Sequence, residues 1–284
     1  MAELPIVRTI AGLREQVRAW RAGGLSVGFV PTMGALHEGH LALIRQARGL
    51  ADRTVCSIFV NPTQFAPTED LDRYPRQEAR DAELLATEGC DLLFAPTPAE
   101  MYPPGFATRI QVAGPTDGLE SDSRPHFFGG VALVVAKLLN QVQADVAVFG
   151  EKDYQQLLTV RRMARDLDIP TQIVGGSTVR DAHGLALSSR NAYLNDAELS
   201  VARRLNVILK QAGLAALSGA PVGQAEAQAA EALLAAGFDR VDYVALRRAE
   251  DLGIFPGDRL GAPARILAAA WLGGTRLIDN MAVE

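Results

Sequence analysis

The chain has 284 residues, 48% of them hydrophobic and 21% charged, which is enough apolar material for one large domain or two modest ones. Its formal net charge of −5 provides no global basic surface, which argues against sequence-independent nucleic-acid binding. We therefore expect a small-molecule partner, and a local basic pocket for a phosphorylated ligand remains compatible with this charge.

Cysteine content and apolar run lengths narrow the class further. Cys56 and Cys90 are the only cysteines, so a disulfide framework or a cysteine-rich metal site has no support, and we expect a reducing cytoplasm. The longest apolar run, VALVVA from Val131, is far shorter than the roughly 20 residues that span a membrane. Residues 1–20 carry charges throughout, so we expect no targeting segment.

Short apolar runs rich in β-branched residues alternate with helical patterns along the first two thirds of the chain. We expect buried parallel strands at 26–30, 54–60, 91–95, 145–150 and 171–176. Apolar residues at intervals of three and four predict helices over 41–52, 76–89, 130–142 and 153–168. This alternation predicts an α/β fold, a Rossmann-like doubly wound parallel sheet that binds ligands at the carboxyl ends of its strands.

The composition changes after Ser188–Asn191. Alanine- and leucine-rich helical patterns cover 196–217 and 223–237, and strands or a hairpin are expected within 240–252 and 264–284. We therefore place a boundary near residue 185, between a larger domain, 1–185, and a smaller C-terminal α+β domain, 186–284.

Two of the four histidines lie in one turn, within GFVPTMGALHEGH. If a helix begins near Gly39, His37 and His40 lie about one helical turn apart on the same side and reach one ligand. Backbone N–H groups at such a helix start attract an anion, and Gly34 and Gly39 allow close approach. A tight turn with one capping and one half-buried histidine is the alternative interpretation.

Several common nucleotide and metal motifs are missing from the sequence. It contains neither G-x-x-x-x-G-K-[ST] nor G-x-G-x-x-G after a strand, so any nucleotide is bound without these two glycine loops. The histidine pair is not part of an H-E-x-x-H motif, and no nearby cysteine or carboxylate set completes a zinc site.

The HEGH stretch resembles the HxGH signature of the nucleotidyltransferase superfamily that includes class I aminoacyl-tRNA synthetases. FVNPTQFAPTEDLDRYPR, VFGEKDYQQL and GLALSSRNAYL resemble the successive motifs of the pantothenate synthetase family, in the same order and over essentially the whole chain. The resemblance implies an α/β enzyme that condenses pantoate with β-alanine, consuming ATP and releasing AMP and pyrophosphate, through a pantoyl adenylate. It also implies a homodimer, and Mg²⁺ held mainly through the ATP phosphates.

The resemblance assigns His37, His40, Lys152 and Arg190 to catalysis, with His40 as general acid or transition-state donor. During adenylation, negative charge spreads over a phosphate, and donors or positive charges nearby would stabilise it. Suitable groups are the histidine N–H donors, the Lys152 ammonium, and the hydroxyls and guanidinium of Ser188–Arg190. Asp153 would accept ribose hydroxyls. The implied ATP-binding set is Met33, Gly34, Ala35, Leu36, His37, Glu38, Gly39, His40, Gly150, Glu151, Lys152, Asp153, Val179, Leu187, Ser188, Ser189 and Arg190. From the residues alone, a solvated helix start at 152–153 and a polar capping loop at 188–190 are the alternatives.

Two glutamines are candidates for the other substrate. An amide offers an acceptor and two donors without charge, so Gln64 and Gln156 suit hydroxyls and a carboxylate that must stay nucleophilic. The resemblance assigns both to the pantoate and β-alanine pocket, together with Met33, Asn61 and Tyr74. Surface glutamines and a core methionine are the alternatives.

The chain departs from the family pattern at one loop. A histidine usually precedes F-x-G-V, whereas here Phe127 holds that position and His126 comes one residue earlier, so we leave His126 out of the site. Glu120 lacks the glycine that normally follows it, and we leave it out as well.

Two rival functions and one domain role complete the expectations. The rivals are an adenylyltransferase acting on a phosphorylated acceptor, which would need a second basic pocket, and a non-catalytic nucleotide-binding regulator. On the preferred interpretation, domain 1–185 binds ATP and pantoate, and 186–284 is a lid that shields the adenylate from water.

Overall fold

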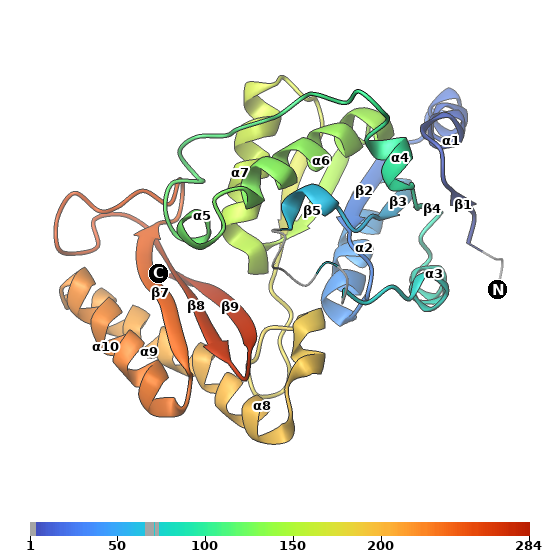
Figure 1. The fold of residues 1–284 in the computed structure, drawn as a ribbon. Helices are drawn as coiled ribbons and strands as arrows, with labels where there is room; N and C mark the ends of the chain where they lie inside the picture. Colours follow the sequence, from blue (N-terminus) through green and yellow to red (C-terminus); the bar gives the residue numbers. More distant parts are fainter. Residues whose placement is uncertain (1–3, 66–70, 72–73) are drawn as a thin grey trace. The chain divides into compact units, whose positions relative to one another are not determined.

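The computed structural model describes residues 4–65, 71 and 74–284 (Figure 1). Residues 66–70 and 72–73, part of the family-like motif at 59–76, lie outside the described residues. The chain divides into two compact units, which are described separately. Unit 1 comprises Met1–Val112, Arg124–Glu151 and Gln156–Ser177, and unit 2 comprises Ala113–Ser123, Lys152–Gln155 and Thr178–Glu284.

Unit 1 is built on a six-stranded parallel sheet in the order β1-β4-β3-β2-β5-β6. Successive strands run outward from β2 on one side, and the chain then returns to add β5 and β6 on the other, as in doubly wound folds. The five predicted strands and the Rossmann-like class are confirmed, and β1 is an addition because two residues are too short to show a pattern. The strands are β1 (Ile6–Val7), β2 (Val27–Thr32), β3 (Arg53–Ile58), β4 (Leu92–Phe94), β5 (Val146–Gly150) and β6 (Gln172–Gly176).

Helices cover both faces of this sheet. A cluster of buried side chains from α2, α3, β2, β3, β4 and β5 forms the core on one face, and α6 packs against α1 and β2. Burial on both faces explains why the strands read as near-continuous apolar runs. The helices are α1 (Ile10–Ala22), α2 (Glu38–Leu50), α3 (Glu78–Thr87), α4 (Pro98–Met101), α6 (Phe127–Val142) and α7 (Tyr154–Asp166), with the 3₁₀ turn η1 (Pro62–Gln64). The 3₁₀ turn η2 (Glu151–Asp153), apart from Glu151, and the first two residues of α7 belong to unit 2.

Unit 2 contains the expected α+β region, with an antiparallel sheet in the order β7-β8-β9. Its longest segment begins at Thr178 rather than at residue 186, and it also includes Ala113–Ser123 and Lys152–Gln155. Gly273 and Gly274 both have positive φ and join β8 to β9 in a two-residue turn, as a tight hairpin requires. The elements are α5 (Glu120–Ser123), η3 (Ser189–Tyr193), α8 (Asp196–Ala202), α9 (Arg204–Leu217), α10 (Val222–Ala236), β7 (Arg240–Arg248), β8 (Ala264–Leu272) and β9 (Thr275–Val283).

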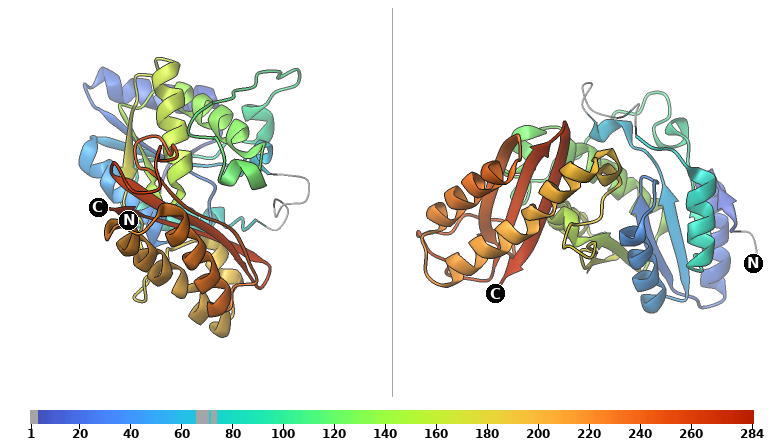
Figure 2. Two further views of the ribbon diagram at one scale, coloured as in Figure 1. Left: turned by 90° about the vertical axis from the view of Figure 1, so that its left-hand side faces the viewer. Right: turned by 90° about the horizontal axis from the view of Figure 1, so that it is seen from below.

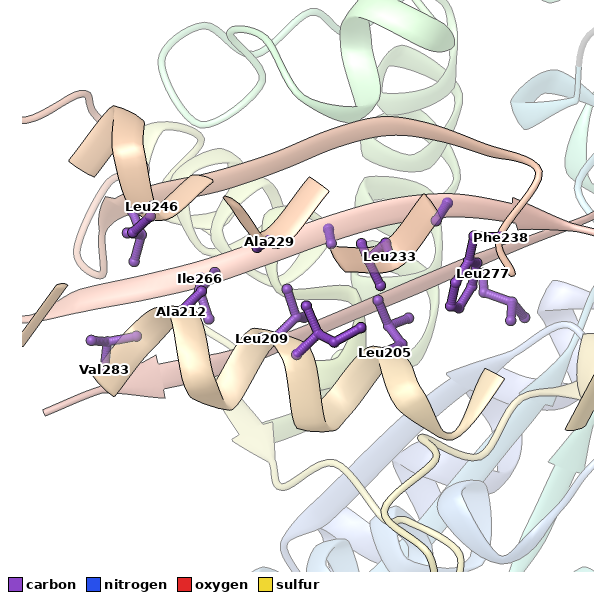
Figure 3. Close-up of a cluster of buried hydrophobic side chains, with 14 of the residues drawn as sticks. Leu205, Leu209, Ala212, Ala229, Leu233, Phe238, Leu246, Ile266, Leu277 and Val283 are labelled. Atoms are coloured by element: carbon purple, nitrogen blue, oxygen red, sulfur yellow. The ribbon is translucent and has the colours of Figure 1, made fainter. Parts of the chain in front are cut away.

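The core of unit 2 lies between its helices and its sheet. Helices α9 and α10 lie side by side along one face of the sheet (Figure 2). Figure 3 shows Leu205 and Leu209 of α9 and Leu233 of α10 directed toward Ile266 and Leu277 of the strands, all of them buried. Within the described residues, none of the helices combines the length and the apolar character that a membrane crossing requires.

A glycine in α6 allows the helix to touch η1. A Cβ on Gly130 would overlap the backbone of Thr63 and approach Gln64, and the Gly130 carbonyl accepts a hydrogen bond from Asn61 Nδ2 at 3.1 Å. Because only glycine permits this approach, α6 determines where the η1 side chains lie.

Replacing Gly130 with Ala should therefore lower the free energy of unfolding by about 1–3 kcal/mol, the usual cost of overpacking. The matched control is Gly129→Ala, because a Cβ there meets its nearest atom, the Ile110 carbonyl oxygen, at 3.4 Å. Better helix propensity should make that variant up to about 1 kcal/mol more stable. Urea denaturation measures both, and equal stability of the two variants would contradict the close approach.

Candidate active site

The turn after β2 is held by a buried carboxylate. Gly34 and Ala35 adopt left-handed conformations, with φ of 83° and 52°. Asp81 of α3, only 1% exposed, accepts hydrogen bonds from the N–H groups of Ala35 at 2.9 Å and Leu36 at 2.8 Å. A Cβ on Gly34 would lie 3.0 Å from Asp81 Oδ2, so glycine is needed where the chain passes this carboxylate.

Asp81 was not among the residues expected from the sequence. Burial raises the pKa of its carboxyl above the ordinary value, and the hydrogen bonds from Leu36 and Ala35 oppose that shift only in part. The available signal was its place in the helical pattern, since Asp81 shares a face with the buried Leu85 four residues later. A carboxylate on a buried helix face must find partners, and here the partners are backbone amides.

The two histidines lie together at the start of α2. His37 is the N-cap, and its Nδ1 accepts from Gly39 N at 3.1 Å. His40 Nδ1 accepts from His37 N at 3.4 Å, and the ring centroids are 4.1 Å apart, as the spacing predicts. A ring nitrogen that accepts a hydrogen bond carries no proton, so each neutral imidazole carries its proton on Nε2. His37 therefore caps the helix through Nδ1.

Asn61 and Gln64 form a buried amide pair at η1, just beyond the carboxyl end of β3. Asn61 is fully buried, and its Oδ1 accepts from Tyr102 Oη at 2.8 Å, which turns its amide nitrogen toward Gln64 Oε1 at 3.1 Å. Gln64 Oε1 is thereby used as an acceptor, and Gln64 Nε2 lies 3.0 Å from Met33 Sδ, a weak acceptor. The pair thus orients Gln64 as a hydrogen-bond donor.

The other predicted substrate residues are less closely joined to this pair. Tyr74 is buried and packs edge-on against Phe65, the residue after Gln64, with centroids 6.1 Å apart. Gln156 is half-buried in α7, and no hydrogen bond between described residues joins it to Gln64 or Asn61. The structure thus brings Met33, Asn61 and Gln64 into contact with one another. Sequence reasoning missed Tyr102, which is 41 residues from Asn61 along the chain.

The structure distributes the predicted ATP-binding residues between the two units. Unit 1 contains Met33 to His40, together with Gly150 and Glu151, which lie at or just after the carboxyl ends of β2 and β5. Unit 2 contains Lys152, Asp153, Val179 and Leu187 to Arg190.

Within unit 2, Lys152 and Arg190 both lie in short 3₁₀ turns, η2 and η3. Lys152 Nζ lies 3.7 Å from Asp153 Oδ1. Ser188 caps η3, with its Oγ accepting from Arg190 N at 3.3 Å. The expected polar cap is therefore present. The Ser188 hydroxyl accepts one hydrogen bond in this cap, and its O–H can still donate to another group.

The loop that departs from the family pattern is anchored inside unit 2. Glu120 is buried, and its carboxylate accepts from Tyr243 Oη at 2.9 Å and Arg276 Nη1 at 2.8 Å. Gln155, next to the predicted Gln156, donates to the Pro115 carbonyl at 3.0 Å and accepts from Glu120 N at 3.1 Å. These contacts give Glu120 and Gln155 structural roles. His126 is exposed at the start of α6.

Comparisons with known proteins were consistent with one another. A family model described as pantoate-beta-alanine ligase matches residues 5–282. A relative from Mesorhizobium japonicum named pantothenate synthetase is 62% identical over 283 residues, covering 100% of this chain and 99% of the relative. One of the same name from Caulobacter vibrioides is 61% identical, covering 98% of each chain.

Two solved structures agree with these relatives. A pantothenate synthetase from Thermus thermophilus superposes with a TM-score of 0.90 at 48% identity, covering 99% of both chains. A pantoate-beta-alanine ligase from Francisella tularensis, complexed with beta-gamma ATP and beta-alanine, superposes with a TM-score of 0.80 at 33% identity, covering 98% of this chain and 97% of that one.

Replacing Asp81 with Asn should disturb the histidine turn. Ala35 N and Leu36 N donate to different oxygens of the carboxylate, and Asn replaces one of these oxygens with an NH2 group that cannot accept. The unfolding free energy should therefore fall by about 1–3 kcal/mol, and ATP affinity should fall on the order of 10-fold. Calorimetric titration with ATP and urea denaturation measure the two effects. Asp91→Asn is the control, since Asp91 accepts from Thr54 N at 2.8 Å in the same sheet, away from the turn. Unchanged ATP affinity in Asp81→Asn would contradict this role.

Proposed function

The chain belongs to the pantoate-beta-alanine ligase family, an ATP-dependent enzyme that makes pantothenate from pantoate and β-alanine, and we propose the residue roles that follow. The observation that carries these roles is the pair of adjacent histidines, His37 and His40, whose Nδ1 atoms accept hydrogen bonds from backbone N–H groups. Both rings then act as Nε2 donors at the start of a helix, where an anion is favoured.

In the first step, a carboxylate oxygen of pantoate attacks the α-phosphorus of ATP. The bond from that phosphorus to the bridging oxygen breaks, and pyrophosphate leaves with the electron pair. We assign the Nε2–H groups of His37 and His40 to the phosphate oxygens, where donors fixed in advance stabilise the charge that develops. His40 is the general acid or transition-state donor.

We assign Gln64 to pantoate as a hydrogen-bond donor. Support comes from the orientation of its amide, because Asn61 occupies Gln64 Oε1 and leaves Gln64 Nε2 as the group that addresses a ligand. A neutral donor binds carboxylate or hydroxyl oxygens without neutralising the nucleophile. Met33, Asn61, Tyr74 and Gln156 complete the proposed pocket for pantoate and β-alanine.

Lys152 and Arg190 are assigned to the phosphates, with Ser188 and Ser189, and Asp153 to the ribose hydroxyls. The support is chemical type, since an ammonium, a guanidinium and hydroxyls are suitable donors to phosphate oxygens. We propose that Mg²⁺ enters as part of the ATP substrate, held mainly by phosphates and waters. In residues 4–65, 71 and 74–284, no three histidine, cysteine or acidic side chains group into a metal site.

In the second step, the β-alanine amine attacks the acyl carbon of pantoyl adenylate. The acyl–oxygen bond breaks, AMP leaves, and the amine loses a proton as the amide forms. We also infer a cytoplasmic homodimer, for which the family resemblance is the support. Sedimentation velocity at micromolar concentration tests the dimer, and a purely monomeric boundary would disprove it.

The two-step scheme predicts that pantoate alone supports exchange of labelled pyrophosphate into ATP. The reason is that adenylation is reversible while no amine consumes the intermediate. The measurement is radiolabel incorporation with ATP, magnesium and each substrate added separately. β-Alanine alone should support no exchange, and exchange that requires β-alanine would disprove an adenylate formed before the amine acts.

Replacing His40 with Ala removes a donor aimed at developing charge, so the single-turnover adenylation rate should fall about 10²- to 10³-fold. ATP affinity should change much less. His126→Ala is the control, because this exposed histidine lies outside the proposed site and should retain the normal rate. The contrary outcome is a large loss of ATP affinity in His40→Ala while bound ATP still reacts at the normal single-turnover rate. In that case His40 contributes to ATP binding and not to the chemical step.

Replacing Gln64 with Ala should lower kcat/KM for pantoate about 10- to 150-fold, since a hydrogen bond to a charged group contributes roughly 1.5–3 kcal/mol. Gln64→Glu should be worse at neutral pH, because it places a negative charge beside the substrate carboxylate. Gln46→Ala is the control, since Gln46 donates to the Gly175 carbonyl elsewhere in unit 1. Wild-type kcat/KM in Gln64→Glu would remove Gln64 from the pocket.

A further inference from the structure

Two adjacent polar residues interrupt the apolar strand β9. Asp279 and Asn280 are each only 3% exposed, and side chains at successive positions of a strand point to opposite faces. Burying a carboxylate and an amide side by side is costly unless each finds partners. The partners identify what these residues do.

Asn280 holds the main chain at Lys152. Its Nδ2 donates to the Lys152 carbonyl oxygen at 2.7 Å, and its Oδ1 accepts from Arg265 Nε. The Arg265 guanidinium lies 3.7 Å over the ring of Tyr154, whose hydroxyl donates to the Ala249 carbonyl at 2.8 Å. The residues on both sides of Asp153 are thus fastened to β8, β9 and the end of β7.

Asp279 holds the start of the loop that leads to Arg190. Its two oxygens accept from Arg180 Nη1 at 2.7 Å and Nη2 at 2.9 Å, a bidentate pair. The same guanidinium donates to the carbonyls of Gly184 at 3.0 Å and Asn280 at 3.1 Å. Arg180 pairs with Ala186 in an isolated β-bridge, so the loop closes on itself before Ser188.

We propose that Asp279 and Asn280 are positioning residues that set the distance between Lys152 and the proposed phosphate ligands Ser188, Ser189 and Arg190. They fasten the two segments to consecutive residues of one strand, so neither segment moves without β9. The proposal rests on the phosphate roles proposed for Lys152 and Arg190. The positive charges of Lys152 and Arg190 stabilise a phosphate only when they are correctly placed. A displacement of such a group by about 1 Å costs on the order of 100-fold in rate.

The decisive variant is Asn280→Asp. It keeps an acceptor for Arg265 but turns a carboxylate oxygen toward the Lys152 carbonyl, so that one hydrogen bond is lost and replaced by repulsion. The full-length variant should bind a non-hydrolysable ATP analogue about 10-fold more weakly, the effect of one lost hydrogen bond. In a Lys152→Ala background the same substitution should have no further effect, because residues that act through one another are not additive.

Asp279→Asn is tested in the same way against Arg190→Ala, since it weakens the bidentate bond at the root of the loop. Glu226→Gln is the matched control for stability. Glu226 accepts from Leu246 N at 2.7 Å and pairs with Arg247 in the same unit, away from Lys152 and Arg190. It should lower the melting temperature and leave analogue binding unchanged.

The outcomes separate the positioning role from the roles on which it rests. Loss of affinity in Lys152→Ala combined with normal affinity in Asn280→Asp overturns the positioning role alone. An equal loss from Asn280→Asp in both backgrounds also overturns it, since the effect then bypasses Lys152. Normal affinity in Lys152→Ala removes the proposed role of Lys152 and the inference with it. If Asn280→Asp does not fold, Asn280→Gln, with its amide one methylene further out, undergoes the same comparison.

Discussion

The turn between β2 and α2, which leads to His37 and His40, depends on the two hydrogen bonds that the Asp81 carboxylate accepts. After β2 the chain must reverse within a few residues, and it does so through left-handed conformations at Gly34 and Ala35. This leaves backbone N–H groups inside the protein, where unpaired donors are costly. One carboxylate from α3 accepts hydrogen bonds from two of these N–H groups. Helix α2 begins directly after the turn, with His37 as its N-cap and His40 in its first turn.

Hydrogen-bond direction is the recurring device in this protein. Backbone N–H groups occupy Nδ1 of both histidines, and Asn61 occupies the carbonyl oxygen of Gln64. Each contact satisfies one side of a polar group and thereby determines which side donates. Such preorganised donors need little rearrangement when charge develops on a ligand, which is how electrostatic stabilisation becomes large.

Unit 2 is assembled from segments that are distant in sequence. Glu120 accepts from Tyr243 and Arg276, which attaches the segment Ala113–Ser123 to β7 and β9. Asn280 attaches Lys152 to β9 in the same way. The buried polar residues of this small sheet therefore organise loops, while its apolar side chains pack on α9 and α10.

The sequence by itself determined the parallel α/β class, strands β2 to β6, the C-terminal hairpin and the family-like motifs. These depend on periodicity and spacing, which are local in the chain. It did not reveal β1 or α1, because a two-residue edge strand is too short to show a pattern and the charged residues of α1 interrupt its apolar ones.

Only the tertiary structure decided which residues hold the motifs in place. Asp81 meets Leu36 across 45 residues, Tyr102 meets Asn61 across 41, and Asn280 meets Lys152 across 128. In the sequence, a buried polar residue is visible only as a polar position within an otherwise apolar pattern, and the sequence does not show which group is its hydrogen-bond partner. The partner is chosen by how the chain folds back, because burial makes pairing obligatory and the geometry of the fold determines which group is within reach.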